Sequence, residues 1–319
     1  MKRLLAIVNP KSGTSKKNDI PEKIERKIAP LDMSLDVAFT EYAGHATELA
    51  KKAADDKYDI VLSVGGDGTC NEIAKALIHT DTALGIIPTG SGNGLARHLG
   101  IPIGVNAAIK SLFDAYHIVA VDYCEANGTP FFCTCGVGFD AQISEKFAAS
   151  KTRGGLTYVI RSAEEYFKYK NEQYIIETAD REIKEKAFII ACGNASQYGN
   201  NAYIAPYASM CDGLIDITIV RPFSFIEVLP MTVQLFTKTL NLNPNVKSFT
   251  SSGFKIIREN AGVMHIDGEP VNMPAEINIK CIHNGLRVML PDIQAANEFE
   301  ATLLGLLSNV FGIKIQKNI

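Results

Sequence analysis

Three glycines, a carboxylate and a hydroxyl stand together in the segment Gly65-Gly66-Asp67-Gly68-Thr69. An apolar run over residues 59–64 precedes it and a helical pattern follows, so the segment is expected to turn from a strand into a helix. Glycines let the backbone come close to an anion, and a helix start offers unpaired N–H groups and the positive end of its dipole. The turn therefore predicts a phosphate site. Asp67 would repel phosphate unless a cation or a proton transfer involves it, which favours phosphoryl transfer over nucleotide storage.

Two further loops carry similar residues. Asn9-Pro10-Lys11-Ser12-Gly13 follows an apolar run over residues 4–8, and Gly90-Ser91-Gly92-Asn93-Gly94 follows another over residues 84–87. Neither these loops nor the first segment has the Walker A spacing of an ordinary P-loop. In a parallel sheet, ligands bind outside the carboxyl ends of the strands. We therefore expect the glycine-rich loops to form one cleft.

The elements that must position these loops alternate along the first 120 residues. Strands are expected at 4–8, 35–39, 60–64 and 84–87, and helices at 20–28, 46–54 and 71–78. Near-continuous apolar strands between helices indicate an α/β fold with a doubly wound parallel sheet. After Asp122 the pattern changes to short β-like runs at 131–137, 173–178, 187–192, 214–220, 249–257, 277–282 and 286–290. Helices are expected at 157–169 and from Ser224, whose capping box ends at Glu227.

The chain of 319 residues is long enough for two domains. We expect an α/β nucleotide-binding domain over residues 1–124 and a β-rich, sandwich-like domain over 125–290. Residues 291–319 are expected to pack back on the first domain, because 294–310 show the spacing of an amphipathic helix. A membrane-surface helix is less favoured there, since the polar face lacks clustered Lys or Arg.

Composition narrows the class of protein. The net charge of −3 gives no general attraction to nucleic acid or anionic lipid. The first apolar run is too short for a signal peptide, and no run approaches the roughly 20 residues of a membrane span, so a cytoplasmic protein, peripheral at most, is expected. The seven cysteines lie mostly in apolar stretches and predict buried thiols; Cys133 and Cys135 fit a strand better than half a metal site.

Taken in order, the motifs resemble those of the diacylglycerol kinase and sphingosine kinase superfamily, in its bacterial soluble branch. The resemblance covers essentially the whole chain and is carried by NPKSG at 9–13, Thr40 with Gly44-His45-Ala46, GGDGT at 65–69 with Asn71-Glu72, GSGNGLAR at 90–97 and Asp267-Gly268-Glu269. It implies a first domain like those of NAD kinases and phosphofructokinases. It also implies an ATP-dependent kinase that phosphorylates a lipid hydroxyl, with the lipid site and the catalytic base in the β-rich domain of residues 125–290.

The resemblance also implies site residues. ATP would lie between the domains, against Asn9, Lys11, Ser12, Gly13, Thr40, Gly65, Gly66, Asp67, Gly68, Thr69, Asn71, Glu72, Gly90, Ser91, Gly92 and Asn93. Glu269 would be the general base, which fits the need for a carboxylate within reach of the acceptor hydroxyl. Asp67 would help bind the catalytic Mg²⁺ or order the phosphates. The motif around Glu269 taken by itself also fits a plain β-turn with solvated acids.

A second, structural Mg²⁺ is implied at Asp212, with the carbonyls of Ser209 and Leu214 and a water-mediated link to Asp122. Mg²⁺ commonly keeps several waters and needs few protein ligands. A simple Asp-Gly turn at residues 212–213 is the alternative.

The motifs define the molecule that receives the phosphate less closely than they define ATP as its source. Many bacterial relatives of the diacylglycerol kinases have GTGND in the third loop, where this chain has Gly94 in place of the carboxylate. Diacylglycerol is the first expectation, followed by a sphingoid base or a ceramide-like alcohol. The alternatives are an NAD-kinase-like enzyme, disfavoured by NPKSG and by the motif at 267–269, and a non-catalytic nucleotide- or lipid-binding protein. A lipid substrate implies transient contact with a membrane surface; no nucleic-acid partner is expected, and a homodimer is compatible with the sequence.

Overall fold

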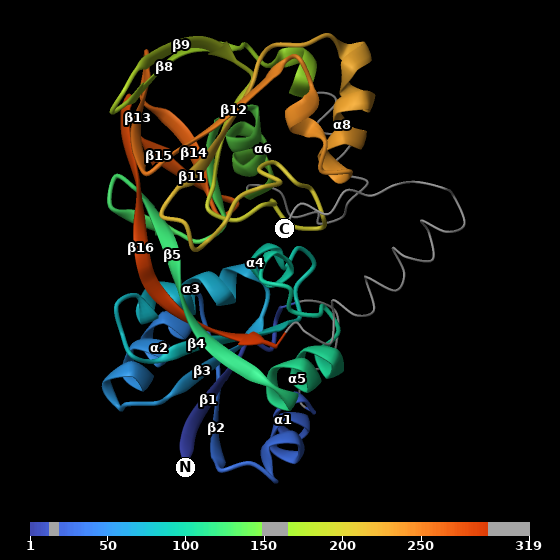
Figure 1. Cartoon of the computed structure of the whole chain (residues 1–319), viewed down its shortest axis with the longest axis vertical. Coiled ribbons are helices and arrows are strands. Elements are labelled where there is room, and N and C mark those ends of the chain that lie inside the picture. Colours follow the sequence, from blue (N-terminus) through green and yellow to red (C-terminus); the bar gives the residue numbers. More distant parts are fainter. Residues whose placement is uncertain (13–18, 149–164, 293–319) are drawn as a thin grey trace, which may run out of the picture.

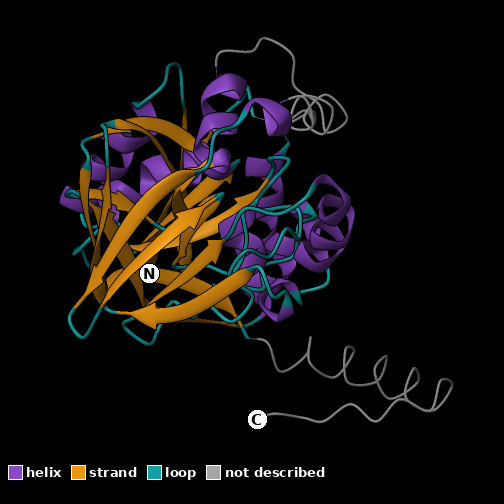
Figure 2. Cartoon of the chain, turned by 90° about the horizontal axis from the view of Figure 1, so that it is seen from above, coloured by secondary structure: helices purple, strands orange, loops and turns teal. Residues whose placement is uncertain are grey.

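The computed structural model describes residues 1–12, 19–148 and 165–292, arranged around two β-sheets (Figures 1 and 2). The larger sheet has ten strands, with the order β2-β1-β3-β4-β16-β13-β8-β9, and β5 and β6 joined to it through β16. The smaller sheet has six strands in the order β12-β11-β10-β7-β14-β15. The expected helix at 294–310 and Gly13 lie outside the described residues. Of the helix expected at 157–169, only the part from residue 165 is described, and 165–168 are helical.

The first half of the chain is the expected doubly wound domain. The strands β1 (Lys2–Val8), β2 (Met33–Phe39), β3 (Ile60–Gly65) and β4 (Ala83–Pro88) are parallel. Leu5 and Ile7 of β1 face a core formed with α2 (His45–Asp55) and α3 (Asp67–Leu77). Leu4 and Val8 face the opposite core, formed with α1 (Ile20–Ile28) and α5 (Val105–Asp114). This alternation explains why every buried position of the strand is apolar.

Two long strands join the halves. The strand β16 (Glu276–Pro291) pairs with β13 (Gly253–Arg258) and β5 (Tyr116–Ala126), and it reaches β4 through the pair Val288 and Leu84 (Figure 1). The sequence suggested two separate strands here, at 277–282 and 286–290. One strand is present instead, because a shift in pairing between Ile282 and Leu286 absorbs the Asn-Gly interruption. The larger sheet is therefore continuous through both halves of the chain.

The second half is β-rich, as expected. Its six-stranded sheet is antiparallel and consists of β12 (Val246–Ser251), β11 (Ile215–Val220), β10 (Ile189–Gly193), β7 (Thr134–Gly138), β14 (Gly262–Ile266) and β15 (Glu269–Met273). In the larger sheet, β8 (Glu172–Thr178) pairs with β13 and with β9 (Glu182–Ala187). A buried core with members from both sheets, including Ile176, Ile217 and Ile256, gives the sandwich.

Several elements differ from their predicted bounds. The helix α3 begins at Asp67, inside the glycine-rich turn, rather than near residue 71. The predicted strand at 131–137 is divided between β6 (Thr129–Phe131) and β7, and the helix α6 (Phe139–Ala148) follows it unpredicted. The helix expected from Ser224 is the short 3₁₀ helix η1 (Phe225–Glu227) followed by α8 (Val228–Phe236) and η2 (Leu240–Leu242). Among the described residues, no helix is long and apolar enough to cross a membrane.

Candidate active site

The three predicted loops meet at the carboxyl edge of the parallel strands. Asn9, directly after β1, donates its side-chain N–H to the Thr69 hydroxyl over 2.9 Å. The hydroxyl oxygens of Ser12 and Thr89 are 3.1 Å apart. The first loop is thus bonded to both of the others, while the Lys11 side chain is exposed beside them. These contacts bring the three loops together, as expected from the sequence.

The second and third loops pack backbone against backbone. A Cβ atom placed on Gly90 would lie 2.6 Å from the Cα of Gly66, so only glycine allows this approach. Asn93 holds the third loop closed, because its side-chain amide accepts from the Gly90 N–H over 3.0 Å and donates to the Gly90 carbonyl over 2.8 Å. Asn93 adopts φ of 51° and is buried. Its role is to shape the loop from within, and Ser91 is the exposed side chain beside it.

Asp67 fastens the second loop to the third. One carboxylate oxygen accepts the Asn93 N–H and the other accepts the Gly94 N–H, each over 2.7 Å. These N–H groups belong to the start of α4 (Gly94–His98), whose unpaired donors need such acceptors. The carboxylate that looked misplaced beside phosphate therefore has two partners in the chain itself.

The start of α3 is open to an anion. The N–H groups of its first turn have no partner within a helix, and this end of the helix dipole is positive. Gly68 is exposed, and no atom lies within 4 Å of the position that its Cβ would occupy. A phosphate can therefore approach the backbone of this turn closely.

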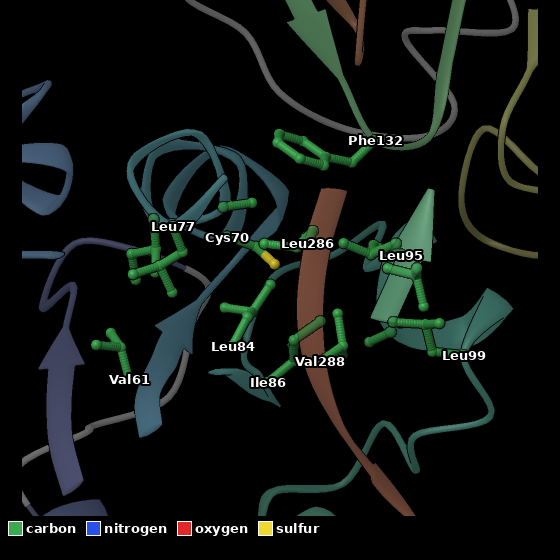
Figure 3. Close-up of a cluster of buried hydrophobic side chains, with 14 of the residues drawn as sticks. Val61, Cys70, Leu77, Leu84, Ile86, Leu95, Leu99, Phe132, Leu286 and Val288 are labelled. Carbon is green, nitrogen blue, oxygen red and sulfur yellow. The ribbon is translucent and has the colours of Figure 1, made fainter. Parts of the chain in front are cut away.

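A buried apolar cluster supports the loops from below. Figure 3 shows Cys70 of α3 and Leu95 of α4 converging with Leu286 of β16, with Phe132 of the second half beside them. Burial raises the pKa of the Cys70 thiol, so it behaves as an apolar side chain rather than as a nucleophile. This cluster packs α3 and α4, the helices that follow the second and third loops, against β16, the strand that runs through both halves.

Two residues expected at the nucleotide have other partners in the structure. The Glu72 carboxylate accepts the N–H groups of Gly44 over 3.0 Å and Ala46 over 3.2 Å, so it caps the start of α2. Thr40 is buried, and its N–H donates to the Val8 carbonyl over 2.9 Å. The start of α2 has no capping side chain of its own, which explains why Glu72 is needed there.

Asp267 anchors the second half of the chain to α3. Its carboxylate accepts the backbone N–H groups of Phe132 over 2.9 Å, Cys133 over 2.8 Å and Thr134 over 3.0 Å, and also the side-chain N–H of Asn71. Burial raises the pKa of the Asp267 carboxyl, and the three backbone donors oppose that shift. Sequence reasoning named Asn71 as a nucleotide contact and gave Asp267 no role, because the bond between them joins positions 196 residues apart.

Glu269 lies two residues beyond this anchor. It is the first residue of β15, pairs with Ile266 across the turn and has an exposed side chain. The turn itself is tight, with φ of 49° at Asp267 and 86° at Gly268. The anchor therefore holds an accessible carboxylate on the second half while binding the helix that begins in the glycine-rich turn.

The third loop has a second contact with the β-rich half. The Asn200 N–H donates to the Gly92 carbonyl over 3.3 Å, and Arg97 donates to the Asn201 side chain over 3.2 Å. A Cβ atom on Gly94 would lie 3.4 Å from the Gly199 nitrogen, in ordinary van der Waals contact. The backbone of Gly199 therefore packs against Gly94, the position where many relatives have a carboxylate.

A buried polar cluster near β15 was missed by sequence reasoning. Asp140 in the first turn of α6 accepts the Tyr198 hydroxyl over 2.8 Å and lies 3.1 Å from Nε2 of His265, which is 2% exposed. A Cβ atom on Gly136 would lie 2.8 Å from both Asp140 and His265, so glycine makes room for the pair. The cluster links the loop that contacts Gly92 to the strand that leads to Glu269. No signal in the sequence marks this cluster, because Asp140, Tyr198 and His265 lie far apart along the chain.

The residues implied for a structural Mg²⁺ are partly engaged with each other. Asp122 is fully buried, and its carboxylate accepts the N–H groups of Gly213 over 2.7 Å and Asn284 over 2.8 Å, with His283 Nδ1 also at 2.8 Å. Asp212 is exposed and accepts the Leu214 N–H over 3.0 Å, as in a plain Asp-Gly turn. The side-chain oxygen of Ser209 accepts a hydrogen bond from the Cys211 N–H. Within the described ranges no group of three or more His, Cys, Asp or Glu is placed to hold a metal. Because chain donors already balance the charge of Asp122, these residues fit a hydrogen-bonded turn better than a metal site.

Comparison with known proteins identifies the class of enzyme. Residues 3–126 match the model of the diacylglycerol kinase catalytic domain, and residues 133–290 match the YegS C-terminal NAD kinase beta sandwich-like domain. The chain is 31% identical over 268 residues to a "Probable lipid kinase YegS-like" of Citrobacter koseri, covering 81% of this chain and 87% of that protein. This chain belongs to the family of YegS-like lipid kinases with a diacylglycerol kinase catalytic domain.

Other relatives agree with this lipid kinase assignment. The "Probable lipid kinase YegS" of Escherichia coli strain SMS-3-5 / SECEC is 30% identical with the same coverage of both chains. A solved structure of a diacylglycerol kinase from Bacillus anthracis str. Sterne matches with a TM-score of 0.72 and 22% identity, covering 91% of this chain and 97% of that one. At that identity the structural match supports the fold of this lipid kinase alone.

Proposed function

We propose that this lipid kinase transfers the γ-phosphate of ATP to the hydroxyl of diacylglycerol and so forms phosphatidic acid. The bond between Asn71 and Asp267 carries the proposal, because it joins the phosphate-binding helix to the turn that presents Glu269. The first domain would bind ATP together with its Mg²⁺, and the second would hold the lipid and the base.

The glycine-rich loops and the start of α3 support the binding of ATP. The open first turn of α3 offers N–H groups to phosphate oxygens, and the exposed side chains of Lys11 and Ser91 stand on the neighbouring loops. Asp67 contributes by fixing the third loop against the second. Preorganised donors of this kind supply electrostatic stabilisation when charge builds up on a transferring phosphoryl group.

The acceptor half rests on Glu269. In the proposed step its carboxylate takes the proton of the lipid hydroxyl, the resulting oxygen forms a bond to the γ-phosphorus, and the bond from that phosphorus to the ADP oxygen breaks. A carboxylate suits this task if it reaches the hydroxyl by a hydrogen bond. Its exposed place on β15 leaves room for such an acceptor.

The test is Glu269→Gln, which keeps the size of the side chain and removes the base. We expect the variant to fold normally and bind ATP as wild type does, while turnover falls by about 100-fold or more. The matched control is Glu259→Gln, another exposed glutamate of the β-rich half, which should keep full activity. Turnover of Glu269→Gln close to that of wild type would remove Glu269 from the mechanism.

The same assay identifies the acceptor. Labelled ATP would be offered with diacylglycerols, sphingoid bases, ceramides and NAD as separate acceptors. Transfer to a sphingoid base or ceramide would move the assignment to the second candidate, in keeping with Gly94 in the third loop. Transfer to NAD would favour ribose phosphorylation, and bound ATP with no transfer to any acceptor would favour a nucleotide- or lipid-binding protein.

A further inference from the structure

One face of the β-rich half exposes large apolar side chains in a helical row. We call it the α8 face and define it by Phe225 and Ile226 of η1 and Leu229, Val233 and Phe236 of α8. Ile226 is 85% exposed and Leu229 is 72% exposed, and the other three are each at least half exposed. The spacing of three and four residues places them on one side of a continuous helical segment.

The α8 face extends to a second element. The ring of Phe167, 68% exposed, lies 4.8 Å from the ring of Phe225. The opposite side of α8 is the one that contributes to the fold, because Met231 is buried in a cluster with Phe188 and Val220. Figure 1 shows α8 at the periphery of the β-rich half. An apolar row of this extent on one side of a peripheral helix is a feature of interaction surfaces.

The segments that form the α8 face also carry exposed lysines. In residues 165–170 and 224–242, the charged side chains that are exposed are all lysines: Lys168, Lys170 and Lys238. The two acids of these stretches are engaged, since Glu165 pairs with Lys146 and Lys168, and Glu227 accepts from Ser224 and Asn245. Counted together, the three lysines and two glutamates give these stretches a net charge of +1, and the lysines are the exposed members.

We propose that the α8 face docks this lipid kinase on the surface of an anionic bilayer. The apolar row would enter the boundary between headgroups and acyl chains, and the lysines would lie against lipid phosphates, as in interfacial helices generally. Docking at this face rests on the proposed function, because an enzyme that phosphorylates a lipid must reach the bilayer that holds this lipid. Charge complementarity favours the bilayer over an apolar protein partner.

The experiment measures binding of the full chain to vesicles of phosphatidylcholine with about 30% phosphatidylglycerol, by co-sedimentation. Ile226→Ser with Leu229→Ser removes two of the most exposed members of the row. We expect the vesicle partition coefficient to fall at least about tenfold, since each buried aliphatic side chain contributes strongly to transfer from water. The matched control is Leu31→Ser with Val37→Ser, two exposed apolar residues of the first domain, which should bind as wild type does. Wild-type binding should weaken at high salt and on vesicles of phosphatidylcholine alone.

The outcomes separate the proposals. Unchanged vesicle binding by the Ile226/Leu229 variant would overturn the docking proposal. So would a change of oligomeric state in that variant, which would assign the face to a second copy, or a fall in its unfolding midpoint, which would assign the face to another segment of this chain. Activity on a short-chain, water-soluble diacylglycerol should be the same in variant and wild type if docking is the only defect. Vesicle binding without phosphate transfer to any acceptor would leave the docking surface standing and refute the proposed function.

Discussion

Replacing Asp267 by Asn tests whether the anchor positions Glu269. The Asp267 carboxylate accepts four N–H donors, two on each oxygen: Cys133 and Thr134 on Oδ1, and Phe132 and Asn71 on Oδ2. An amide has one oxygen and one NH₂ group. Whichever way the new amide is turned, two of the four donors face another donor.

The magnitude follows from those two lost bonds. A hydrogen bond to a charged group contributes about 1.5–3 kcal/mol, so Asp267→Asn should lower the free energy of unfolding by about 3–6 kcal/mol. The turn would also shift relative to α3. Because misplacement of a catalytic group by about 1 Å can reduce a rate by about 100-fold, turnover should fall by that order while ATP binding changes little.

The assay combines urea unfolding, ATP binding and steady-state kinetics on the purified variant. A second variant, Asn71→Asp with Asp267→Asn, exchanges the two groups and restores one attractive pair between the same positions. Relative to the two single variants it should recover at least about 1 kcal/mol of coupling in a double-mutant cycle, together with part of the turnover. Wild-type turnover in folded Asp267→Asn, or no coupling in the cycle, would refute the anchoring role.

Two further predictions concern residues of α4. Gly94→Asp should lower the free energy of unfolding by about 1–3 kcal/mol in urea, because the new carboxylate would lie beside that of Asp67, which accepts the N–H of residue 94; stability equal to wild type would contradict this charge argument. Burial, aided by Lys238, lowers the pKa of His98 from 6.5 to about 4. Between these values the unfolded chain binds a proton that the folded chain does not, so stability should fall by about 2 kcal/mol from pH 7 to pH 5. His98→Asn should remove most of this pH dependence in thermal or urea unfolding, whereas the exposed-site control His117→Asn should retain it.

Local patterns were sufficient for the first four strands and first three helices. The buried positions of β1, β3 and β4 are apolar apart from Ser63, and each predicted helix from 20 to 78 is present within a few residues. The early start of α3 at Asp67 was missed because glycines disfavour helix interiors, yet the first turn of a helix tolerates them when an anion site is needed. The buried side of α8 packs through Met231 in a cluster with Phe188 and Val220.

Other features depended on contacts between distant residues. The Asn-Gly interruption near residue 284 looks like a turn in sequence, but Asp122 binds the Asn284 N–H and β16 continues through it. The resemblance implied Glu72 as a nucleotide contact, and in the structure its carboxylate also accepts the N–H groups of Gly44 and Ala46, 28 and 26 residues away. A carboxylate takes whichever unpaired N–H groups the fold brings to it, and sequence spacing does not reveal them.

The sequence by itself determined the class of chemistry, since glycine-rich turns after buried strands are local features whose backbone conformation and missing Cβ atoms already specify a phosphate site. Tertiary structure alone decided what the carboxylates do. Asp67 clamps two loops, Asp267 anchors the turn before Glu269, and Glu269 stays exposed. The physical reason is that hydrogen bonding depends on which donors lie within about 3 Å in space, and these donors come from parts of the chain that only folding brings together.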